Sequence, residues 1–317
     1  MLNFGITTSL VDNDALTLVH DTVSDVEAGI ISDCKVNCVV STRGMGDNSE
    51  TDNRLRTLEE FLSPRSIPLV MVSAKQAGRL VKSPTNKDKD RYDGKIIEAV
   101  EETCGPLPST FLMAGDMITH GLLCDRASLL NLHPDIPHLL GGVKGIYYQI
   151  IGNWVREEMG LPVIIEGKVV EEKPSRNRLV GSQIHLGIRE LDMGDPVAYF
   201  AFGLRDRVAD TDLNKLWDEL PKDSVQIGQI IREQVAKKDK PDHPLFRELR
   251  RAEAQYEMEL IRQVLISITK GRINIIDGKV CNETRIPLPK GLDLSHEVLK
   301  DSVVNYVERP KDARKET

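Results

Sequence analysis

The sequence has few aromatic residues and no excess of positive charge. Phe, Trp and Tyr make up only 4% of its 317 residues, so we expect aliphatic side chains to build the core. The formal net charge is −7, which gives no basic field to attract the phosphate backbone of a nucleic acid. We therefore expect no nucleic-acid partner.

Cysteines are few, and long hydrophobic runs are absent from the sequence. The five cysteines are an odd number without a C-x-x-C pair, so we expect neither a disulfide framework nor a metal site. The longest apolar runs are too short to span a membrane, and the first residues do not have the basic and apolar segments of a signal peptide. These features predict a cytoplasmic protein without membrane contact.

Short apolar, β-branched runs alternate with helical patterns in the first half of the chain. The runs at residues 2–6, 36–40, 68–72, 111–115 and 129–133 predict strands. Between them, apolar residues recur at the spacing of a helix. This alternation is typical of βαβ units. It predicts an α/β fold with an open, mostly parallel sheet, helices on both faces and a Rossmann-like N-terminal half.

The second half has a different pattern. Residues 163–170 resemble a hairpin, and residues 183–188 and 197–202 predict two strands joined by a short loop. Dense charge and helical spacing over residues 205–252 predict inserted helices. The charged segment 83–93 predicts a surface loop that leads into a helix.

Two polar clusters carry the candidate chemistry. Asn131 and His133 are two residues apart at the end of a predicted strand, so their side chains point to one face. Open α/β sheets build their sites beyond such strand ends. The second cluster contains His185 and the loop with Asp192 and Asp195. A purely structural role stays open for each cluster. Asn131 and His133 could be solvated residues at a strand-to-loop junction, and Asp192 and Asp195 could bond their own backbone in a turn.

Five short segments together resemble the folate-dependent formyltransferases. They are Asn-Leu-His-Pro at 131–134, the His185 strand with Glu-Leu-Asp-x-Gly-x-Pro from 190, Met-Ala-Gly-Asp-Met at 113–117, Arg-Tyr-Asp at 91–93, and Leu-Ile-Ser to Gly-Arg-Ile over 265–273. In the family, the segment like 113–117 reads Leu-Ala-Gly-Phe-Met. The segments occur in the family's order and span most of residues 1–280.

The resemblance implies transfer of a formyl group from 10-formyltetrahydrofolate, as co-substrate, to a primary amine. Asn131 would stabilise the oxyanion, His133 would donate a hydrogen bond or proton, and Asp192 would orient His133 and help to remove the amine proton. His185 would be a structural neighbour. The family's pterin site maps onto Met117, Ile118, Thr119, His120, Ile188, Arg189, Glu190 and Leu191, and no metal is implied.

The resemblance places the acceptor at the loop after the first strand, with Thr8, Ser9 and Asn13 as candidate substrate-binding residues. Relatives that act on a phosphorylated amine have a glycine-rich loop there, which cradles phosphate at a helix N-terminus. This chain lacks those glycines, and Asp12 and Asp14 would repel phosphate. Glycinamide ribonucleotide of purine biosynthesis is the first candidate acceptor, and a related amine is the second.

The predicted organisation is a formyltransferase-like domain over 1–285 with insertions near 152–176 and 205–250, followed by a partly disordered extension over 286–317. The partners would be a small-molecule amine and folate, and a homodimer stays open. Two other functions also stay open: a hydrolase that releases formate from the folate, and a catalytically silent folate-binding protein.

Overall fold

The structure is a computed structural model of the chain. The residues that it describes are 1–10, 12–79, 85–116, 118–134, 137, 163–165, 168–170, 179–190, 193–203, 219, 226, 229–230 and 244–299. The chain divides into two compact units. The first comprises Met1–His133, Ile184–Ala198 and Leu260–Leu292, and the second comprises Pro134–Gln183, Tyr199–Glu259 and Asp293–Thr317.

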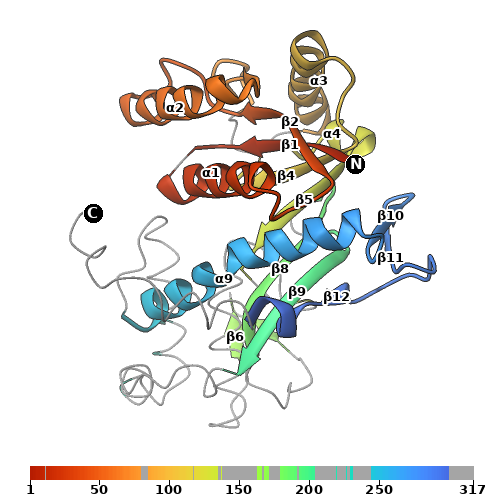
Figure 1. Cartoon of the computed structure of the whole chain (residues 1–317). Helices are drawn as coiled ribbons and strands as arrows, with labels where there is room; N and C mark the ends of the chain where they lie inside the picture. Colours follow the sequence, from red (N-terminus) through yellow and green to blue (C-terminus); the bar gives the residue numbers. More distant parts are fainter. Residues whose placement is uncertain are drawn as a thin grey trace. The chain divides into compact units, whose positions relative to one another are not determined.

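Five parallel strands form the centre of the first unit (Figure 1). They are β1 (Leu2–Thr8), β2 (Cys34–Ser41), β3 (Leu69–Met71), β4 (Thr110–Ala114) and β5 (Ser128–His133). Their order in the sheet is β5-β4-β1-β2-β3, so the direction of the crossovers reverses between β1 and β4. This order confirms the Rossmann-like N-terminal half, and it marks the loops after β1 and β4 as the switch point where such sheets bind ligands.

The same sheet continues beyond β5 through β8 (Leu179–Gly187), β9 (Pro196–Gly203) and β12 (Leu292–Asp293). β8 and β9 are neighbours, as the predicted strand pair requires. A separate antiparallel pair, β6 (Val163–Ile165) and β7 (Lys168–Val170), confirms the hairpin expected there. A second pair consists of β10 (Asn274–Ile276) and β11 (Lys279–Cys281).

The helices of the described residues are α1 (Asn13–Glu27), α2 (Ser49–Leu62), the 3-10 turn η1 (Ser63–Arg65), α3 (Asn86–Cys104), α4 (Leu123–Arg126) and α9 (Pro244–Thr269). Residues 295–299 are also helical. The helices predicted within 205–250 lie mostly outside the described residues, although 244–250 begin α9. No helix among the described ranges is long and apolar enough to cross a membrane.

The start of α3 corrects most of the expected surface loop over residues 83–93, of which 83 and 84 lie outside the described residues. Thr85 and Asp88 form a capping box, in which each side chain bonds the backbone N–H of the other. A box of this kind satisfies backbone donors that a helix start leaves without partners. The charged residues from Asn86 onward are therefore helical, and among them Tyr92 and Asp93 are buried.

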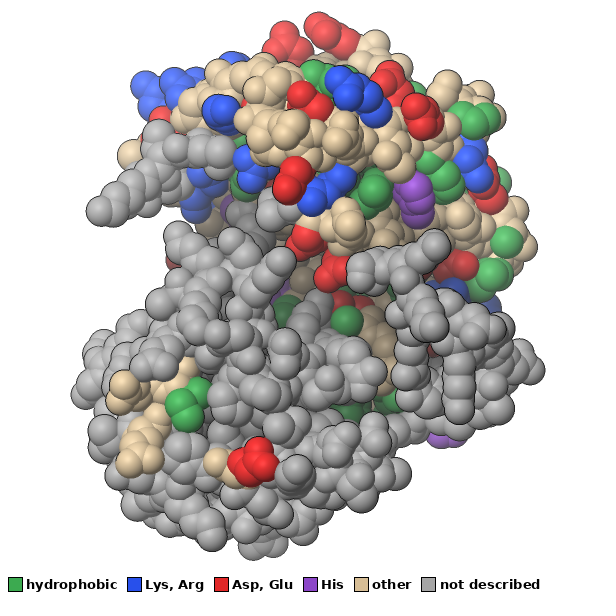
Figure 2. Space-filling model, turned by 90° about the vertical axis from the view of Figure 1, so that its left-hand side faces the viewer, with side chains coloured by type: hydrophobic (Ala, Val, Ile, Leu, Met, Phe, Trp, Pro, Cys, Tyr) green, Lys and Arg blue, Asp and Glu red, His purple; other side chains and the backbone are tan. Residues whose placement is uncertain are grey.

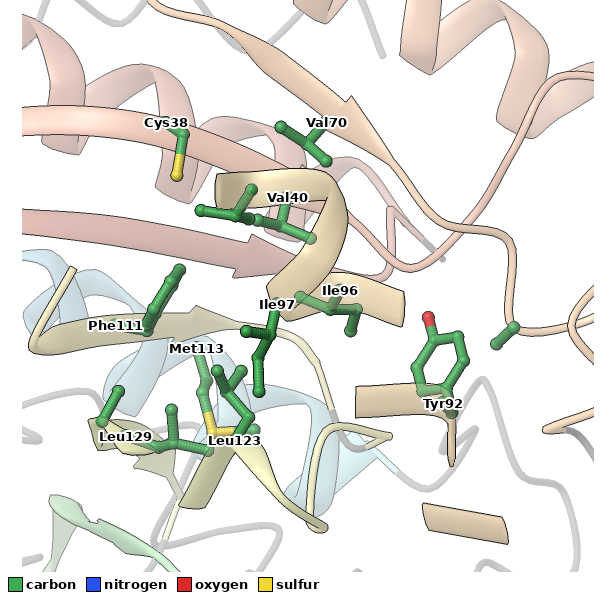
Figure 3. Packing of buried hydrophobic residues seen from close by; sticks show 13 residues of the cluster. Cys38, Val40, Val70, Tyr92, Ile96, Ile97, Phe111, Met113, Leu123 and Leu129 are labelled. Carbon is green, nitrogen blue, oxygen red and sulfur yellow. The ribbon is translucent and has the colours of Figure 1, made fainter. Parts of the chain in front are cut away.

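Helix α3 covers one face of the parallel strands, and Figure 3 shows its side chains against that face. Tyr92, Ile96, Ile97 and Val100 of α3 pack with Cys38, Val40, Phe111, Met113 and Leu129 of the strands. Alternate strand residues such as Ile6, Val39 and Leu112 point to the opposite face. There α1 contacts β1, β2 and β4 (Figure 1). The aliphatic core and the helices on both faces agree with the predicted α/β architecture.

Charged side chains of both signs are interspersed on the described part of the face in Figure 2. Ion pairs also occur among the described residues, for example Arg65 with Glu27 at 2.8 Å and Arg54 with Glu50 at 3.5 Å. Opposite charges this close cancel much of each other's field at longer range.

Candidate functional site

The two polar residues of the first cluster lie on β5, as their spacing predicted. Asn131 lies beside Met113 of β4 in the sheet, and His133 is the last residue of the strand. Both side chains are buried, with 6% and 7% of their surface exposed. The strand therefore delivers an amide and an imidazole together at the carboxyl end of a parallel sheet.

His185 completes this pair from the neighbouring strand β8. Its Nε2 lies 3.1 Å from Nδ2 of Asn131, and its Nδ1 lies 2.9 Å from the carbonyl oxygen of Leu186. A carbonyl oxygen only accepts, so Nδ1 carries the proton and Nε2 accepts from the Asn131 amide. His185 is thus held as a neutral imidazole that orients the Asn131 amide.

The two histidine rings are also close. The ring centroids of His133 and His185 lie 5.7 Å apart with an interplanar angle of 60°. Sequence reasoning treated His185 only as a structural neighbour. Its direct bond to Asn131 depends on β8 lying beside β5, and the alternation of residues along β8 could not reveal which strand is its neighbour.

The carboxylate predicted for the site, Asp192, lies outside the described residues, as does Leu191. Around them, Met193 donates its backbone N–H to Glu190 at 3.4 Å, and Leu186 donates to the Asp195 carbonyl at 2.9 Å. These two bonds join residues that precede Asp192 in the sequence to residues that follow it, in the connection between β8 and β9. Its role in the site stays a prediction.

The loop after β4 contains the predicted pterin-binding residues Ile118, Thr119 and His120, whereas Met117 lies outside the described residues. Asp116 accepts from the backbone N–H of Ile118 at 2.9 Å and from the hydroxyl of Thr119. Arg79, only 8% exposed, donates from Nη2 to the Ile118 carbonyl at 3.0 Å. Arg79 and Asp116 therefore hold the main chain of this loop through buried charged groups. The family's segment has Phe at the position of Asp116.

Asp93, from the Arg-Tyr-Asp segment, holds the next turn of the same loop. Its Oδ2 accepts from the backbone N–H groups of Gly121 at 2.7 Å and Leu123 at 3.0 Å. Burial raises the pKa of Asp93 to about 6, against the lowering effect of these two N–H groups. Asp116 adds a smaller raising effect and Arg79 a smaller lowering one.

The loop after β8 carries Ile188, Arg189 and Glu190. His120 donates from Nδ1 to the Ile188 carbonyl at 2.8 Å, because a carbonyl oxygen can only accept. The structure thus brings the two predicted pterin-binding segments, 118–120 and 188–190, into direct contact. Glu190 is exposed at the far end of the second segment.

The candidate acceptor residues lie around the loop that follows β1: Thr8 ends the strand, Ser9 lies in the loop and Asn13 begins α1. Thr8 and Ser9 are buried, and the Ser9 hydroxyl donates to the Gly115 carbonyl of the loop after β4. The Thr8 hydroxyl accepts from the backbone N–H of Leu10 at 3.3 Å. Asn13 is exposed and accepts from Arg54 Nε at 3.1 Å. The predicted substrate-binding role of these residues stays a prediction.

The side chain of Asp12 caps α1 by accepting from the backbone N–H of Ala15 at 2.9 Å. A carboxylate therefore occupies the helix N-terminus at which a phosphate would bind in a glycine-rich loop. Among the described residues, no group of His, Cys, Asp or Glu is arranged to hold a metal ion.

Comparison of the sequence with protein-family models and with curated proteins finds no match. Solved structures do match. Phosphoribosylglycinamide formyltransferase from Coxiella burnetii is 14% identical with a TM-score of 0.52, and the match covers 92% of this chain and 98% of that one. Glycinamide ribonucleotide transformylase 1 from Symbiobacterium toebii is 15% identical over 88% and 93% of the chains, with a TM-score of 0.49.

A sugar N-formyltransferase from a Shewanella species is 13% identical over 92% of this chain and 76% of that one, with a TM-score of 0.41. The Coxiella burnetii structure, matched over nearly its whole length, carries the conclusion on architecture. The chain therefore has the α/β fold of a phosphoribosylglycinamide formyltransferase, which confirms the fold that the resemblance implied.

Proposed function

We propose that the protein transfers a formyl group from 10-formyltetrahydrofolate to a primary amine. Glycinamide ribonucleotide of purine biosynthesis is the first candidate acceptor. The observation that carries the proposal is the Asn131 amide, which neutral His185 orients beside His133 at the buried end of β5. The fold shared with phosphoribosylglycinamide formyltransferase supports it.

Asn131 supplies the electrostatic part of the reaction. The amine's lone pair forms a bond to the formyl carbon, and the π electrons of the carbonyl move onto its oxygen. An amide N–H that is already oriented stabilises this oxyanion without a reorganisation cost. His185 accepts one hydrogen of the Asn131 amide, which fixes the plane in which the other amide hydrogen lies.

His133 and Asp192 supply the proton chemistry in this proposal. His133 donates a hydrogen bond or proton to the developing oxyanion, and Asp192 removes the amine proton through a water molecule. The bond between the formyl carbon and N10 of the folate then breaks, and N10 takes up a proton. The products are the formylated amine and tetrahydrofolate.

The folate donor lies, in this proposal, against the main chain of 118–120 and 188–190. Backbone donors and acceptors recognise a flat heterocycle through its edge, so the side-chain types there need not match those of other enzymes. The hydrogen bonds that Arg79 and His120 donate and that Asp116 accepts support the assignment, because they fix this main chain before any ligand arrives.

A hydrolase is the second candidate function, and the loop after β1 is the observation that favours it. Thr8 and Ser9 are buried there, and the Asp12 carboxylate caps α1. A carboxylate at this helix N-terminus opposes the binding of a phosphate there. Water would then attack the formyl carbon, and formate would leave in place of a formylated amine.

Conversion of 10-formyltetrahydrofolate to tetrahydrofolate, with and without glycinamide ribonucleotide, distinguishes these functions. Turnover that requires the amine supports the transferase, and turnover without it supports the hydrolase. Asn131→Asp keeps the shape of the side chain but removes the N–H donor, so kcat should fall about 10²- to 10³-fold. A protein that binds the folate without turnover with either acceptor would instead be the silent binder.

We also propose a cytoplasmic location and the domain boundaries given by the sequence. The predicted extension over 286–317 contains β12 and the helical residues 295–299. Whether the chain forms a homodimer is checked by light scattering during size-exclusion chromatography.

A further inference from the structure

Arg189 makes a three-residue ion network on the loop after β8. Its Nη1 lies 2.7 Å from Oδ1 of Asp90 on α3. Its Nη2 and Nε bond the two carboxylate oxygens of Asp125 on α4, at 2.5 and 3.3 Å. One guanidinium therefore binds two carboxylates, and one of these contacts is the two-pronged pairing that fixes geometry as well as charge.

The backbone of the same loop is held by two further side chains. Lys89 donates from Nζ to the Arg189 carbonyl at 2.8 Å, and His120 donates to the Ile188 carbonyl at 2.8 Å. Lys89 and Asp90 are consecutive residues of α3. The loop is thus attached to α3 through both the side chain and the carbonyl of Arg189.

The loop after β4 is attached to the same helix turn. Asp93 of α3 accepts from the N–H groups of Gly121 and Leu123. Gly121 lies so close to α3 that a Cβ added there would meet the backbone oxygen of Lys89 at 2.7 Å. Residues 89–93 of α3 therefore hold both loops at a fixed separation.

We propose that Arg189 is a positioning residue for the formyl donor. With Asp90 and Asp125, it fixes the main chain of residues 188–190 against residues 118–120, and this main chain is the part that the proposed function assigns to the folate heterocycle. This inference rests on the proposed function. Arg189 need not touch the reacting atoms, because it acts through the main chain that binds the folate donor.

An ordinary surface ion pair would have a different effect. Arg126, also on α4, pairs with Glu101 at 3.8 Å and is half exposed. Asp90 and Asp125 are themselves 40% and 50% exposed, so the difference lies in geometry: Arg126 makes one long contact, whereas Arg189 makes three contacts of 2.5 to 3.3 Å to two carboxylates. Single exposed pairs contribute little to stability. Arg126→Ala is therefore the matched control for Arg189→Ala, since both changes remove one arginine near α4.

The test measures the affinity for 5-formyltetrahydrofolate, a folate that carries no transferable 10-formyl group, together with steady-state kinetics for 10-formyltetrahydrofolate. We expect Arg189→Ala to weaken folate binding about fivefold and to raise KM for the donor by more than it lowers kcat. Arg189→Lys should recover only part of the affinity, because an ammonium group lacks the planar set of N–H donors that bonds Asp90 and both carboxylate oxygens of Asp125. Arg126→Ala should bind the folate like the unmutated protein.

Hydrogen exchange of the backbone amides gives a readout that does not depend on turnover. Peptides over 118–123 and 186–195 should exchange faster in Arg189→Ala than in Arg126→Ala. Asp125→Asn removes one negative charge from the network and keeps the size of the side chain. This variant replaces Arg189→Ala if Arg189→Ala does not fold. Equal folate affinity in the Arg189 or Asp125 variant and in Arg126→Ala, or equal exchange rates, would overturn the inference while leaving the proposed function intact. If the unmutated protein binds no folate, the proposed function fails and this inference fails with it.

Discussion

At the scale of single residues, the candidate site depends on how one histidine is protonated. His185 has a carbonyl oxygen at Nδ1 and the Asn131 amide at Nε2, so both ring nitrogens are committed when the imidazole is neutral. A buried amide left without this acceptor would rotate or lose a hydrogen bond. The orientation of Asn131 is therefore a property of two strands rather than of one residue.

His185→Ala should lower kcat/KM for folate turnover about tenfold to a hundredfold, because an unoriented amide stabilises the oxyanion less well. The measurement is the same folate-conversion assay. His296→Ala removes an exposed histidine in the second unit and serves as the control. Equal kcat/KM in the two variants would show that Asn131 needs no orientation by His185.

Asp93 should make the stability of the protein depend on pH. Its pKa is about 6 in the folded protein and 3.8 ordinarily, so between these values the native state binds a proton that the unfolded chain releases. The resulting stabilisation is complete below about pH 4 and is lost as the pH rises through 6. The difference corresponds to about 3 kcal/mol.

Asp93→Asn should remove this dependence, since the amide oxygen still accepts from Gly121 and Leu123 but does not titrate. The free energy of unfolding in urea, measured at several values between pH 4 and pH 8, checks it. We expect the variant to gain stability relative to the unmutated protein as the pH rises. Parallel pH profiles of the two proteins would contradict the proposed burial of a titrating Asp93.

At the scale of elements, α3 connects the core to the candidate site. Its apolar side packs on the sheet through Ile96, Ile97 and Val100. Its first turns carry Lys89, Asp90 and Asp93, which hold the two loops. A capping box at Thr85 fixes where this helix starts. The position of these loops thus depends on the start and the packing of one helix.

Gly121→Ala should separate the loop after β4 from α3, because the new Cβ would lie 2.6 Å from the backbone carbon of Lys89. Forcing an atom into such a contact typically costs about 1–3 kcal/mol of stability. Gly94→Ala is the control on α3 itself, where an added Cβ meets nothing within 4 Å. A helical alanine there should stabilise by about 0.5–1 kcal/mol. Thermal unfolding compares the two, and stabilisation in both would contradict the tight approach.

At the scale of the whole molecule, residues distant in sequence complete the first unit. The C-terminal turns of α9 bury Leu260, Ile261 and Val264. Arg262 on the same turns donates to Asp25 of α1 at 2.8 and 2.9 Å, across 237 residues of sequence. The first unit is therefore not complete until the chain has returned to it at residue 260.

Arg262→Ala should destabilise the protein by about 2–4 kcal/mol, since it leaves the Asp25 carboxylate, 11% exposed, without its main ionic partner. Arg126→Ala, which breaks the more exposed pair with Glu101 at 3.8 Å, should cost less than about 1 kcal/mol. Urea unfolding measures both. Equal costs would show that the pair between α9 and α1 behaves like a surface contact.

The sequence by itself determined the local features of this protein. The strand positions in the first half and the strand that presents Asn131 and His133 follow from patterns within a few residues, because backbone geometry and hydrophobic periodicity act at that range. The order of the polar segments along the chain was sufficient to indicate the formyltransferase fold. The charged residues after Thr85 were expected in a loop because of their charge density. They are helical because Thr85 and Asp88 form a capping box, which the prediction did not take into account.

Only the tertiary structure decided which distant groups meet. The bond between His185 and Asn131, the network of Arg189 with Asp90 and Asp125, and the pair of Arg262 with Asp25 join residues 54 to 237 positions apart. Their partners depend on the order of strands in the sheet and on how closely the helices pack on it. Those choices minimise the free energy of the whole fold, so no short stretch of sequence contains them.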